Sequence, residues 1–213
     1  AGVKVHYVPF LTEDCTLDTD DLQNKLSDRT RLVAVGCASN AVGTINPVAD
    51  ICRWAHAAGS QVYLDAVHYA PHRLVDVQAI GCDFLACSAY KFYGPHIGVL
   101  WGRRALIETT DVPRLDPAPQ ESPERLETGT QNHEAIAGAA AAVDFLAGIA
   151  GSGTGSRRAA LEAAYGELHT RGEALLARLW NGLEAIPGVT LFGPRPGRPR
   201  TPTLAFVMQG KQT

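Results

Sequence analysis

The amino-acid sequence predicts an α/β fold, in which a mostly parallel sheet is covered by helices on both faces. Between residues 30 and 110, short apolar runs alternate with segments of helical periodicity, which is the pattern of strands joined by helical crossovers. The first run, LVAVGCAS at 32–39, is almost continuously apolar, as is typical of a strand buried on both faces. Apolar residues make up 46% of the 213 residues and charged residues 19%, a balance that can build a core.

The individual elements follow from these runs. Pro47 suits the first turn of a helix and Gly59 suits its end, so we expect a helix from Pro47 to Ala58. A short helical stretch is expected near Val75–Ala79, and ALIETT at 105–110 begins another. Strands are expected in four runs: 32–39, 61–66, 83–89 and 98–102.

The second half of the chain predicts a different organisation. Residues 111–123 are rich in proline and acid and should form a surface excursion. An alanine-rich helix is expected at His133–Leu146, followed by a GSGTGS hinge at 151–156. A long amphipathic helix, Arg157–Ile186, follows, with Leu161, Leu168, Leu175, Leu179 and Leu183 near one face. Strands at 189–192 and 203–208 complete the pattern.

We therefore divide the chain into residues 1–150, part of a large domain, and residues 151–213. The second part holds a linker, the long helix and the first strands of a smaller, incomplete α+β domain. The opening run AGVKVHYVPF alternates like a strand, and the last run is also strand-like. Both ends look cut, so we expect the chain to be a fragment of a longer protein.

Composition excludes several classes of function. A net charge of −3 indicates neither a nucleic acid nor an anionic membrane as partner. No apolar run is long enough to span a bilayer, and the first residues lack a signal-peptide pattern. The five cysteines form no Cys-x-x-Cys pair, which favours reduced, mostly buried thiols and a cytoplasmic protein.

Lys91 is the first candidate functional residue. The chain has fifteen arginines but only four lysines, and Lys91 alone lies within an apolar run, DFLACSAYKFYGPHIG. A desolvated lysine loses part of its preference for the charged form and can attack an aldehyde as a free amine. The alternative is a lysine whose stem packs on apolar neighbours while its head reaches water.

Asp65 is the second candidate. It follows the run QVYL and so lies at the carboxyl end of a strand, where open α/β sheets bind ligands. A carboxylate there can hold the proton on a pyridine nitrogen, although an aspartate in a turn is a common alternative. Asp65 and Lys91 are 26 residues apart with one helical crossover between them, so both can reach one ring from adjacent strands.

Five motifs resemble the class V aminotransferase family, and within it the cysteine desulfurase and selenocysteine lyase branch. The resemblance covers about half of the chain and implies fold type I, with pyridoxal 5'-phosphate as cofactor in a homodimer. The large domain of that fold has seven strands and is followed by a smaller carboxyl-terminal one. The motifs are SNAVGTINPV, LDAVH, VDVQAIGCDF, SAYKFYGP and ETGTQN.

The resemblance implies a role for each matching residue. Lys91 corresponds to the lysine that forms the internal aldimine with the cofactor, and Asp65 to the partner of the pyridine nitrogen. Ser88 and Tyr90 correspond to two residues close to that lysine that bind the phosphate. Many desulfurases have histidine in place of Tyr90, but the tyrosine hydroxyl can also donate to a phosphate oxygen.

Three further positions carry implied roles. Asn40 falls near the cofactor's phenolic oxygen and the substrate carboxylate, and Thr130 contacts phosphate across the dimer interface. His68 stands where desulfurases commonly have a glutamine that contacts the phenolic oxygen. A histidine can donate the same hydrogen bond, and it can also titrate near neutrality and move a proton. The sequence leaves both roles of this third catalytic candidate open.

A cysteine desulfurase-like lysis of a C–S or C–Se bond is the reaction we expect. An aminotransferase or amino-acid epimerase is the alternative, because none of the five cysteines matches a desulfurase nucleophile. A truncated, non-catalytic homologue is a third reading. No metal site is expected, since Pro71 lies between His68 and His72 and no acid or cysteine completes a set of ligands.

Overall fold

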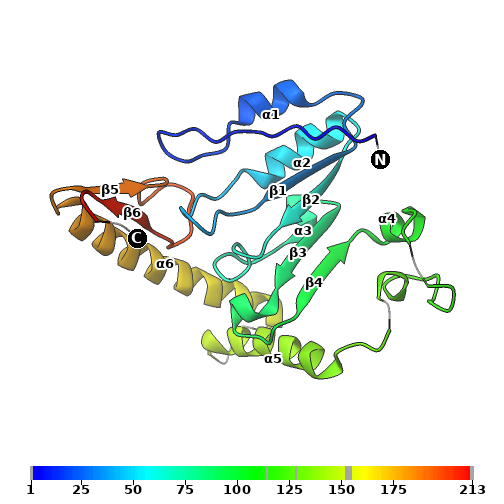
Figure 1. Cartoon of the computed structure of the whole chain (residues 1–213). Coiled ribbons are helices and arrows are strands. Elements are labelled where there is room, and N and C mark those ends of the chain that lie inside the picture. The colour runs from blue at the N-terminus through cyan, green and yellow to red at the C-terminus, as the bar shows by residue number, and fades with distance from the viewer. Residues whose placement is uncertain (1, 114, 128, 152–154, 212–213) are drawn as a thin grey trace.

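The computed structural model describes residues 2–113, 115–127, 129–151 and 155–211 (Figure 1). A four-stranded sheet, with strands in the order β1-β2-β3-β4, forms the centre of the chain. A separate pair of strands, β5 and β6, lies beside the long helix near the carboxyl end (Figure 1). The structure thus has the mixed, mostly parallel sheet that the alternating pattern predicted.

The first three strands are parallel and in register. They are β1 (Leu32–Gly36), β2 (Gln61–Asp65) and β3 (Phe84–Ser88), while β4 (Gly98–Gly102) runs antiparallel to β3. Gly36 pairs with Asp65, and Asp65 pairs with Ala86. The carboxyl ends of β1, β2 and β3 therefore meet at one edge of the sheet. Each of the four strands lies within its predicted run.

Helices flank this sheet. Helix α2 (Val48–Ala57) packs on β2, begins after Pro47 and ends before Gly59, as predicted. Helix α3 (Val77–Ile80) is capped by Asp76, and α4 (Arg104–Thr109) follows β4. The main core cluster is formed by apolar side chains of α2 and the strands: Cys37, Val48, Cys52, Ala55, Val62, Leu64, Ala66, Cys82 and Leu85.

A second cluster lies where the carboxyl end of β3 meets α5 (His133–Ile149) and α6 (Arg157–Glu184). A short 3-10 turn, η2 (Glu124–Leu126), lies between α4 and α5 in the chain. The cluster buries small and apolar residues from the loop after β2, from the turn after β3 and from α5: Ala70, Ala89, Phe92, Ala142 and Leu146. Figure 1 shows α5 and α6 side by side below this end of the sheet. The long helices therefore support the edge at which the parallel strands end.

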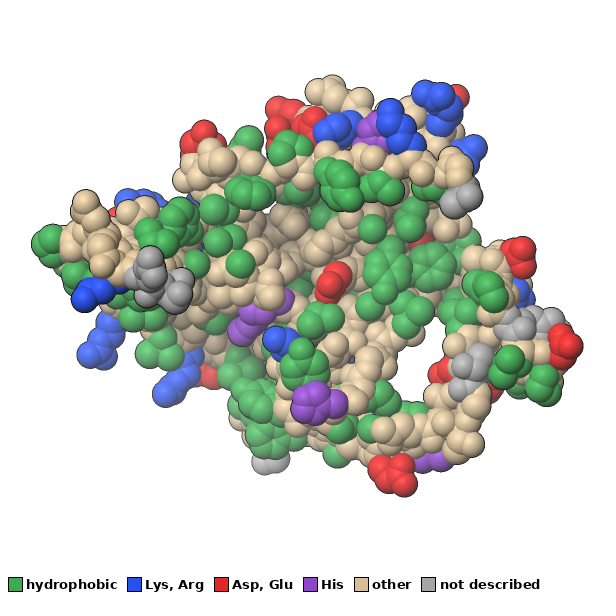
Figure 2. Space-filling model, viewed as in Figure 1, with side chains coloured by type: hydrophobic (Ala, Val, Ile, Leu, Met, Phe, Trp, Pro, Cys, Tyr) green, Lys and Arg blue, Asp and Glu red, His purple; other side chains and the backbone are tan. Residues whose placement is uncertain are grey.

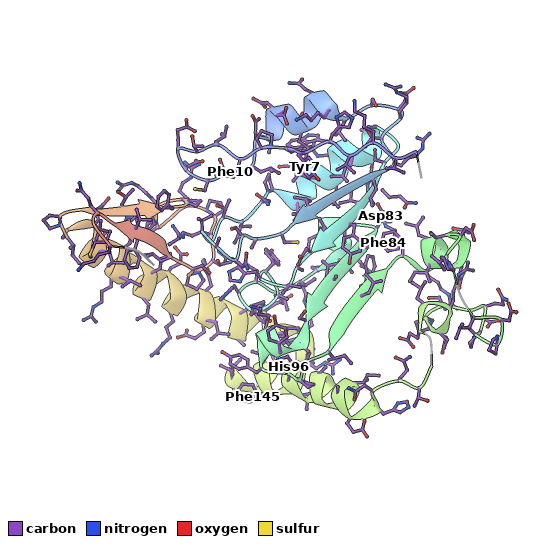
Figure 3. The ribbon with its side chains drawn as sticks, viewed as in Figure 1. Tyr7, Phe10, Asp83, Phe84, His96 and Phe145 are labelled. Atoms are coloured by element: carbon purple, nitrogen blue, oxygen red, sulfur yellow. The ribbon has the colours of Figure 1, made fainter. Side chains whose placement is uncertain are left out.

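The opening residues differ from the prediction. Residues 2–9 form no strand, and only an isolated bridge joins Phe10 to Leu17. Tyr7 and Phe10, labelled in Figure 3, are 83% and 62% exposed. Alternation specifies a strand only where a neighbouring strand supplies hydrogen bonds, and residues 2–9 pair with none of the described strands. The following helix, α1 (Thr19–Lys25), was not predicted.

Helix α6 presents a different face from the predicted one. Leu175 and Leu179 are 57% and 53% exposed, whereas Ala164, Leu176 and Trp180 are buried. The buried positions 160, 164, 176 and 180 follow helical spacing. Packing of these small and aromatic residues fixes the rotation of the helix, so the five leucines do not form one buried stripe.

The carboxyl-terminal strands are β5 (Val189–Phe192) and β6 (Ala205–Met208), paired antiparallel. The connection between them returns to the loop after β1. There the backbone N–H of Thr201 donates to Gly43 O at 2.8 Å, and Thr44 forms an isolated bridge with Arg200. Arg200 is only 1% exposed, and its guanidinium carbon lies 5.0 Å from the centroid of the Trp180 ring.

A buried carboxylate organises the opposite end of the sheet. Asp83, labelled in Figure 3 at the start of β3, accepts a hydrogen bond from Val62 N at 2.8 Å. Its carboxylate also contacts His56 Nε2 at 2.8 Å and Arg103 Nε at 3.0 Å. Buried charges are stable when paired and hydrogen-bonded in this way. This network ties the amino end of β3 to its neighbours, away from the edge at which the parallel strands end.

The fold predicts the effect of adding a side chain at Gly193. This residue has a φ of +92°, and an added Cβ would overlap the carbonyl oxygen of Val42. The Gly193→Ala variant should therefore lose stability through both left-handed strain and overpacking, about 1–2 kcal/mol and about 1–3 kcal/mol respectively. Gly197→Ala is the matched control, since Gly197 has a φ of +85° and no atom near the added Cβ. If urea unfolding shows an equal loss in the free energy of unfolding for the two variants, the close packing of Gly193 against Val42 is contradicted.

Candidate functional site

The edge formed by the carboxyl ends of β1, β2 and β3 gathers most of the predicted residues. Asp65 is the last residue of β2, and Ser88 is the last residue of β3. Lys91 lies on η1 (Ala89–Phe92), a 3-10 turn that follows β3 directly. Asn40 is exposed in the turn after β1, which is closed by a hydrogen bond from Gly43 N to Ser39 O. Parallel pairing thus brings four separate sequence positions to one edge of the sheet.

Lys91 is exposed, which agrees with the alternative of a lysine whose head reaches water and not with a desolvated amine. The 3-10 turn directs Ala89 and Phe92 into the second cluster and leaves Tyr90 and Lys91 outside. The amine lies 5.3 Å from the centroid of the Tyr90 ring. Among the described residues, no hydrogen bond or ion pair engages Lys91 Nζ. The amine is therefore available to a ligand.

Asp65 is also exposed. It acts as a turn residue and still leaves one oxygen available for a ligand, so the two roles considered for it are compatible. One oxygen, Oδ1, accepts a hydrogen bond from Val67 N at 2.8 Å, as in a turn. Within the described ranges, its other oxygen has no partner and no cation pairs with the carboxylate. The turn fixes the carboxylate by one oxygen and leaves the other oxygen available.

His68 is held by two threonines that are distant in sequence. Its Nε2 lies 2.8 Å from Thr203 Oγ1 and 3.1 Å from Thr201 Oγ1. Its ring also contacts that of His72, with centroids 5.0 Å apart. Burial, together with the charge of Lys91, lowers the pKa of His68. The ring is accordingly biased towards its neutral form.

A cavity of about 370 Å³ opens beside these residues. His68, Tyr90 and Lys91 line it, together with basic or titratable side chains from the loop after β2, from α6 and from the β5–β6 connection: His72, Arg73, His169, Glu173 and Arg200. Figure 2 shows histidine, basic and acidic side chains near the middle of the visible face. Asp65, Ser88 and Asn40 do not line this cavity, so it adjoins only part of the predicted site.

The remaining predicted residues are less closely grouped. Tyr90 stacks on His96, with ring centroids 4.9 Å apart, and Figure 3 shows His96 close to α5. Thr130 is exposed and precedes α5. Thr130 is not among the residues that line the Lys91 cavity.

Sequence reasoning missed the contribution of residues 200–203. Arg200, Thr201 and Thr203 reach the site only because the β5–β6 connection folds back on the loop after β1. The run RPRTPT at 198–203 gave one usable signal, an arginine in a proline-rich connection that leads into a predicted strand. Nothing in the local sequence indicated that its neighbours contact His68.

The cysteines, by contrast, lie largely where they were expected. All five are free, and Cys37, Cys52 and Cys82 are buried. Burial raises the pKa of Cys37 to about 12 and that of Cys52 to about 11. These thiols are inert core residues at neutral pH. In the described part of the chain, no three His, Cys, Asp or Glu side chains are arranged to hold a metal, and no helix is long and apolar enough to cross a membrane.

Comparison with known proteins gives consistent matches. The family model described as aminotransferase class-V matches residues 1–213. A probable cysteine desulfurase from Xylella fastidiosa strain 9a5c is 34% identical, over 98% of this chain and 49% of its own length. A cysteine desulfurase from Dickeya dadantii is 38% identical, over 70% of this chain and 39% of its own length.

A solved structure, the apo form of a cysteine desulfurase from Thermococcus onnurineus NA1, is similar with a TM-score of 0.83 and 27% identity. The match covers 99% of this chain and 52% of that one. The chain thus spans about half the length of the relatives it matches most fully. Fold and sequence comparisons therefore agree on the same group of proteins.

The site predicts a pH dependence of stability. Burial, followed by the neighbouring His68 and Arg73, lowers the pKa of His72 from 6.5 to about 4. Between these values the unfolded chain binds a proton that the folded chain excludes, so the free energy of unfolding should fall as the pH drops from 6.5 to 4. Denaturant unfolding at several pH values should show a shallower fall for His72→Gln than for the unchanged protein. His133→Gln, at the start of α5, is the matched histidine replacement, and equal slopes for both variants would refute the assignment.

Proposed function

Because the chain belongs to the class V aminotransferase family, we propose that the protein is a pyridoxal-phosphate-dependent enzyme acting on an amino acid. We further propose that it catalyses a cysteine desulfurase-like cleavage. The single observation that carries the proposal is the placement of Lys91 and Asp65 at the same edge of the sheet. Asp65 is the last residue of β2, and Lys91 follows the end of the adjacent parallel strand β3. Among the described residues, the Lys91 amine and one Asp65 carboxylate oxygen have no hydrogen-bond partner.

The residues at this edge fit pyridoxal phosphate. Lys91 offers an unpaired amine, and Asp65 offers a carboxylate whose second oxygen has no partner among the described residues. Ser88 and Tyr90, which closely precede Lys91 in the sequence, add two hydroxyl groups. When bound, the cofactor would supply an electron sink for an amino acid. The amine, the carboxylate and the hydroxyls match its aldehyde, pyridine nitrogen and phosphate in turn.

The roles of the individual residues follow from these positions. Lys91 Nζ would hold the cofactor and then move the proton at the α-carbon of the substrate. Asp65 would keep a proton on the pyridine nitrogen and fix the orientation of the ring. Asn40, exposed beside the same edge, would donate to the phenolic oxygen or to the substrate carboxylate.

His68 is proposed as a hydrogen-bonding group of the site. Its lowered pKa favours the neutral ring at neutral pH, and its Nε2 is already engaged by two threonine hydroxyls. Both features support the hydrogen-bonding role left open by the sequence over that of a proton carrier.

The choice of reaction rests on the relatives. Those that match are named cysteine desulfurases, which supports C–S or C–Se cleavage over the alternatives of amino transfer and epimerisation. A non-catalytic homologue is the other alternative. The visible absorbance band of the cofactor in the purified protein tests this last alternative, because a chain that binds no cofactor should show no such band.

We also propose a cytoplasmic homodimer in which Thr130 reaches the phosphate of the neighbouring subunit. Thr130 is exposed and does not line the Lys91 cavity of its own chain, as an interface role requires. The small residues of α5 have a role within the chain as well, since a Cβ on Gly138 would lie 3.2 Å from Pro95 Cγ. The division at residue 150 into a large and a smaller domain remains part of this proposal.

Lys91 gives the decisive test of the function. Borohydride reduction of the protein with pyridoxal phosphate, followed by peptide mapping, should leave the pyridoxyl group on Lys91. The reason is that Lys91 is the lysine at the edge where the parallel strands end. Lys4, Lys25 and Lys211 are internal controls in the same digest, and a label on any of them instead would overturn the proposal. The Lys91→Ala variant should show no reducible linkage.

Asp65 gives a second test. The Asp65→Asn variant should retain part of its cofactor but lose most of its turnover, because an amide cannot hold the pyridine nitrogen in its charged form. Steady-state rates and cofactor titration measure the two effects separately. Asp116→Asn, at an exposed position in the surface excursion, is the matched control, and near-normal turnover in Asp65→Asn would rule out the assigned role.

A further inference from the structure

Two threonines of the β5–β6 connection converge on one nitrogen of His68. Thr203 Oγ1 lies 2.8 Å from Nε2, Thr201 Oγ1 lies 3.1 Å from it, and the two hydroxyl oxygens are 3.0 Å apart. Thr201 is fully buried, with 0% exposure. A ring nitrogen has either one proton or one lone pair, so this triangle restricts how the protons can be arranged.

In one arrangement the two hydroxyls donate inwards, towards the ring. Thr201 donates to Thr203, and Thr203 donates to the lone pair of Nε2, over 3.0 Å and 2.8 Å. In the reverse arrangement, Nε2–H donates outwards and the last hydroxyl, that of Thr201, must donate to Gly43 O at 3.4 Å. That carbonyl already accepts the N–H of Thr201 at 2.8 Å. The inward arrangement therefore ends on the better acceptor.

The charges around the ring also oppose a second proton on it. Lys91 from η1, Arg73 and His72 from the loop after β2, and Arg200 from the β5–β6 connection line the same cavity. Helix α6 contributes His169 and one acid, Glu173, and η1 contributes Tyr90 and Tyr93. A cavity wall with three basic side chains (Lys91, Arg73 and Arg200) and one carboxylate favours a neutral imidazole.

The connection that bears the threonines is firmly attached. Arg200 Nη2 donates to Val42 O and to Thr203 O, and Arg200 Nε donates to Thr201 O at 3.3 Å. Pro199 O accepts from Ile45 N, and Thr201 N donates to Gly43 O. The hydroxyls therefore approach His68 from a backbone whose own groups are already bonded to the loop after β1.

We propose that Thr201 and Thr203 are positioning residues for His68, forming a hydroxyl relay that ends as a donor on Nε2 and holds the ring as its Nδ1–H tautomer. The relay leaves Nδ1–H as the one donor of the ring. The role of that donor in catalysis rests on the proposed function, because it assumes that His68 belongs to the cofactor site. The tautomer itself does not depend on it.

The tautomer can be measured directly. Two-bond ¹H–¹⁵N correlation spectra of the ¹⁵N-histidine-labelled protein, with and without pyridoxal phosphate, report which nitrogen carries the proton. His68→Gln assigns the signal. The cofactor-free protein should show the Nδ1–H form. Thr203→Val should move the tautomer ratio about fivefold towards Nε2–H, as loss of one neutral hydrogen bond of about 1 kcal/mol requires.

Two further variants separate positioning from packing. Thr203→Ser keeps the hydroxyl and should keep the tautomer ratio of the unchanged protein. If Thr203 acted only through packing, Thr203→Ser would be more disruptive than Thr203→Val. Thr190→Val, at an exposed position of β5, is the matched control. The pKa of His68 should rise in Thr203→Val, because the neutral ring loses its donor.

The proposal fails if His68 of the unchanged protein is the Nε2–H form. It fails also if a folded Thr203→Val leaves the ratio where it was. Should that variant not fold, the spectrum of the unchanged protein together with Thr201→Val decides, since removal of the first donor should shift the ratio in the same direction. A protein that gives the Nδ1–H form yet binds no pyridoxal phosphate would support the relay and refute the proposed function.

Discussion

Parallel pairing of β1, β2 and β3 is the constraint on which the rest of the structure depends. The register that sets Gly36 beside Asp65, and Asp65 beside Ala86, ends the three strands at one edge. Because a parallel connection needs a crossover, the residues that follow each strand come from well-separated parts of the chain. The candidate site is the meeting point of those segments, and helices α5 and α6 support it through the second cluster.

The buried Arg200 links this edge to the carboxyl-terminal part of the chain. Its guanidinium has no carboxylate partner among the described side chains, and it is held instead by backbone carbonyls and the face of Trp180. Burial lowers the pKa of Arg200, while Glu173 partly offsets this effect. Arg200 Nε and Nη2 are bonded to carbonyls, while its buried Nη1 has no hydrogen-bond partner in the described structure. This buried cation couples the loop after β1, the β5–β6 connection and α6, so that residues from both parts of the chain meet at His68.

The electrostatics of the site follow from this assembly. Basic side chains from η1, from the loop after β2 and from residue 200 surround one cavity with a single acidic residue on its wall. Both His68 and His72 have lowered pKa values, His68 through burial and the charge of Lys91, and His72 mainly through burial. Neutral imidazoles beside an amine are suited to hydrogen bonding near neutral pH. The basic residues of the same wall would attract an anionic ligand.

The sequence by itself determined the α/β class, the four strands of the main sheet, α2 and the candidate pair of Lys91 and Asp65, because these depend on local periodicity and on motifs within short segments. Local pattern could not give the exposure of Lys91, since the 3-10 turn decides which of residues 89–92 point inwards. It suggested a strand at residues 2–9, where alternation finds no partner strand. It was also silent on Thr201 and Thr203, which lie more than 130 residues from His68 in sequence and reach it only through tertiary packing. Contacts of such separation are fixed by how the elements assemble, and the tertiary structure alone decided them.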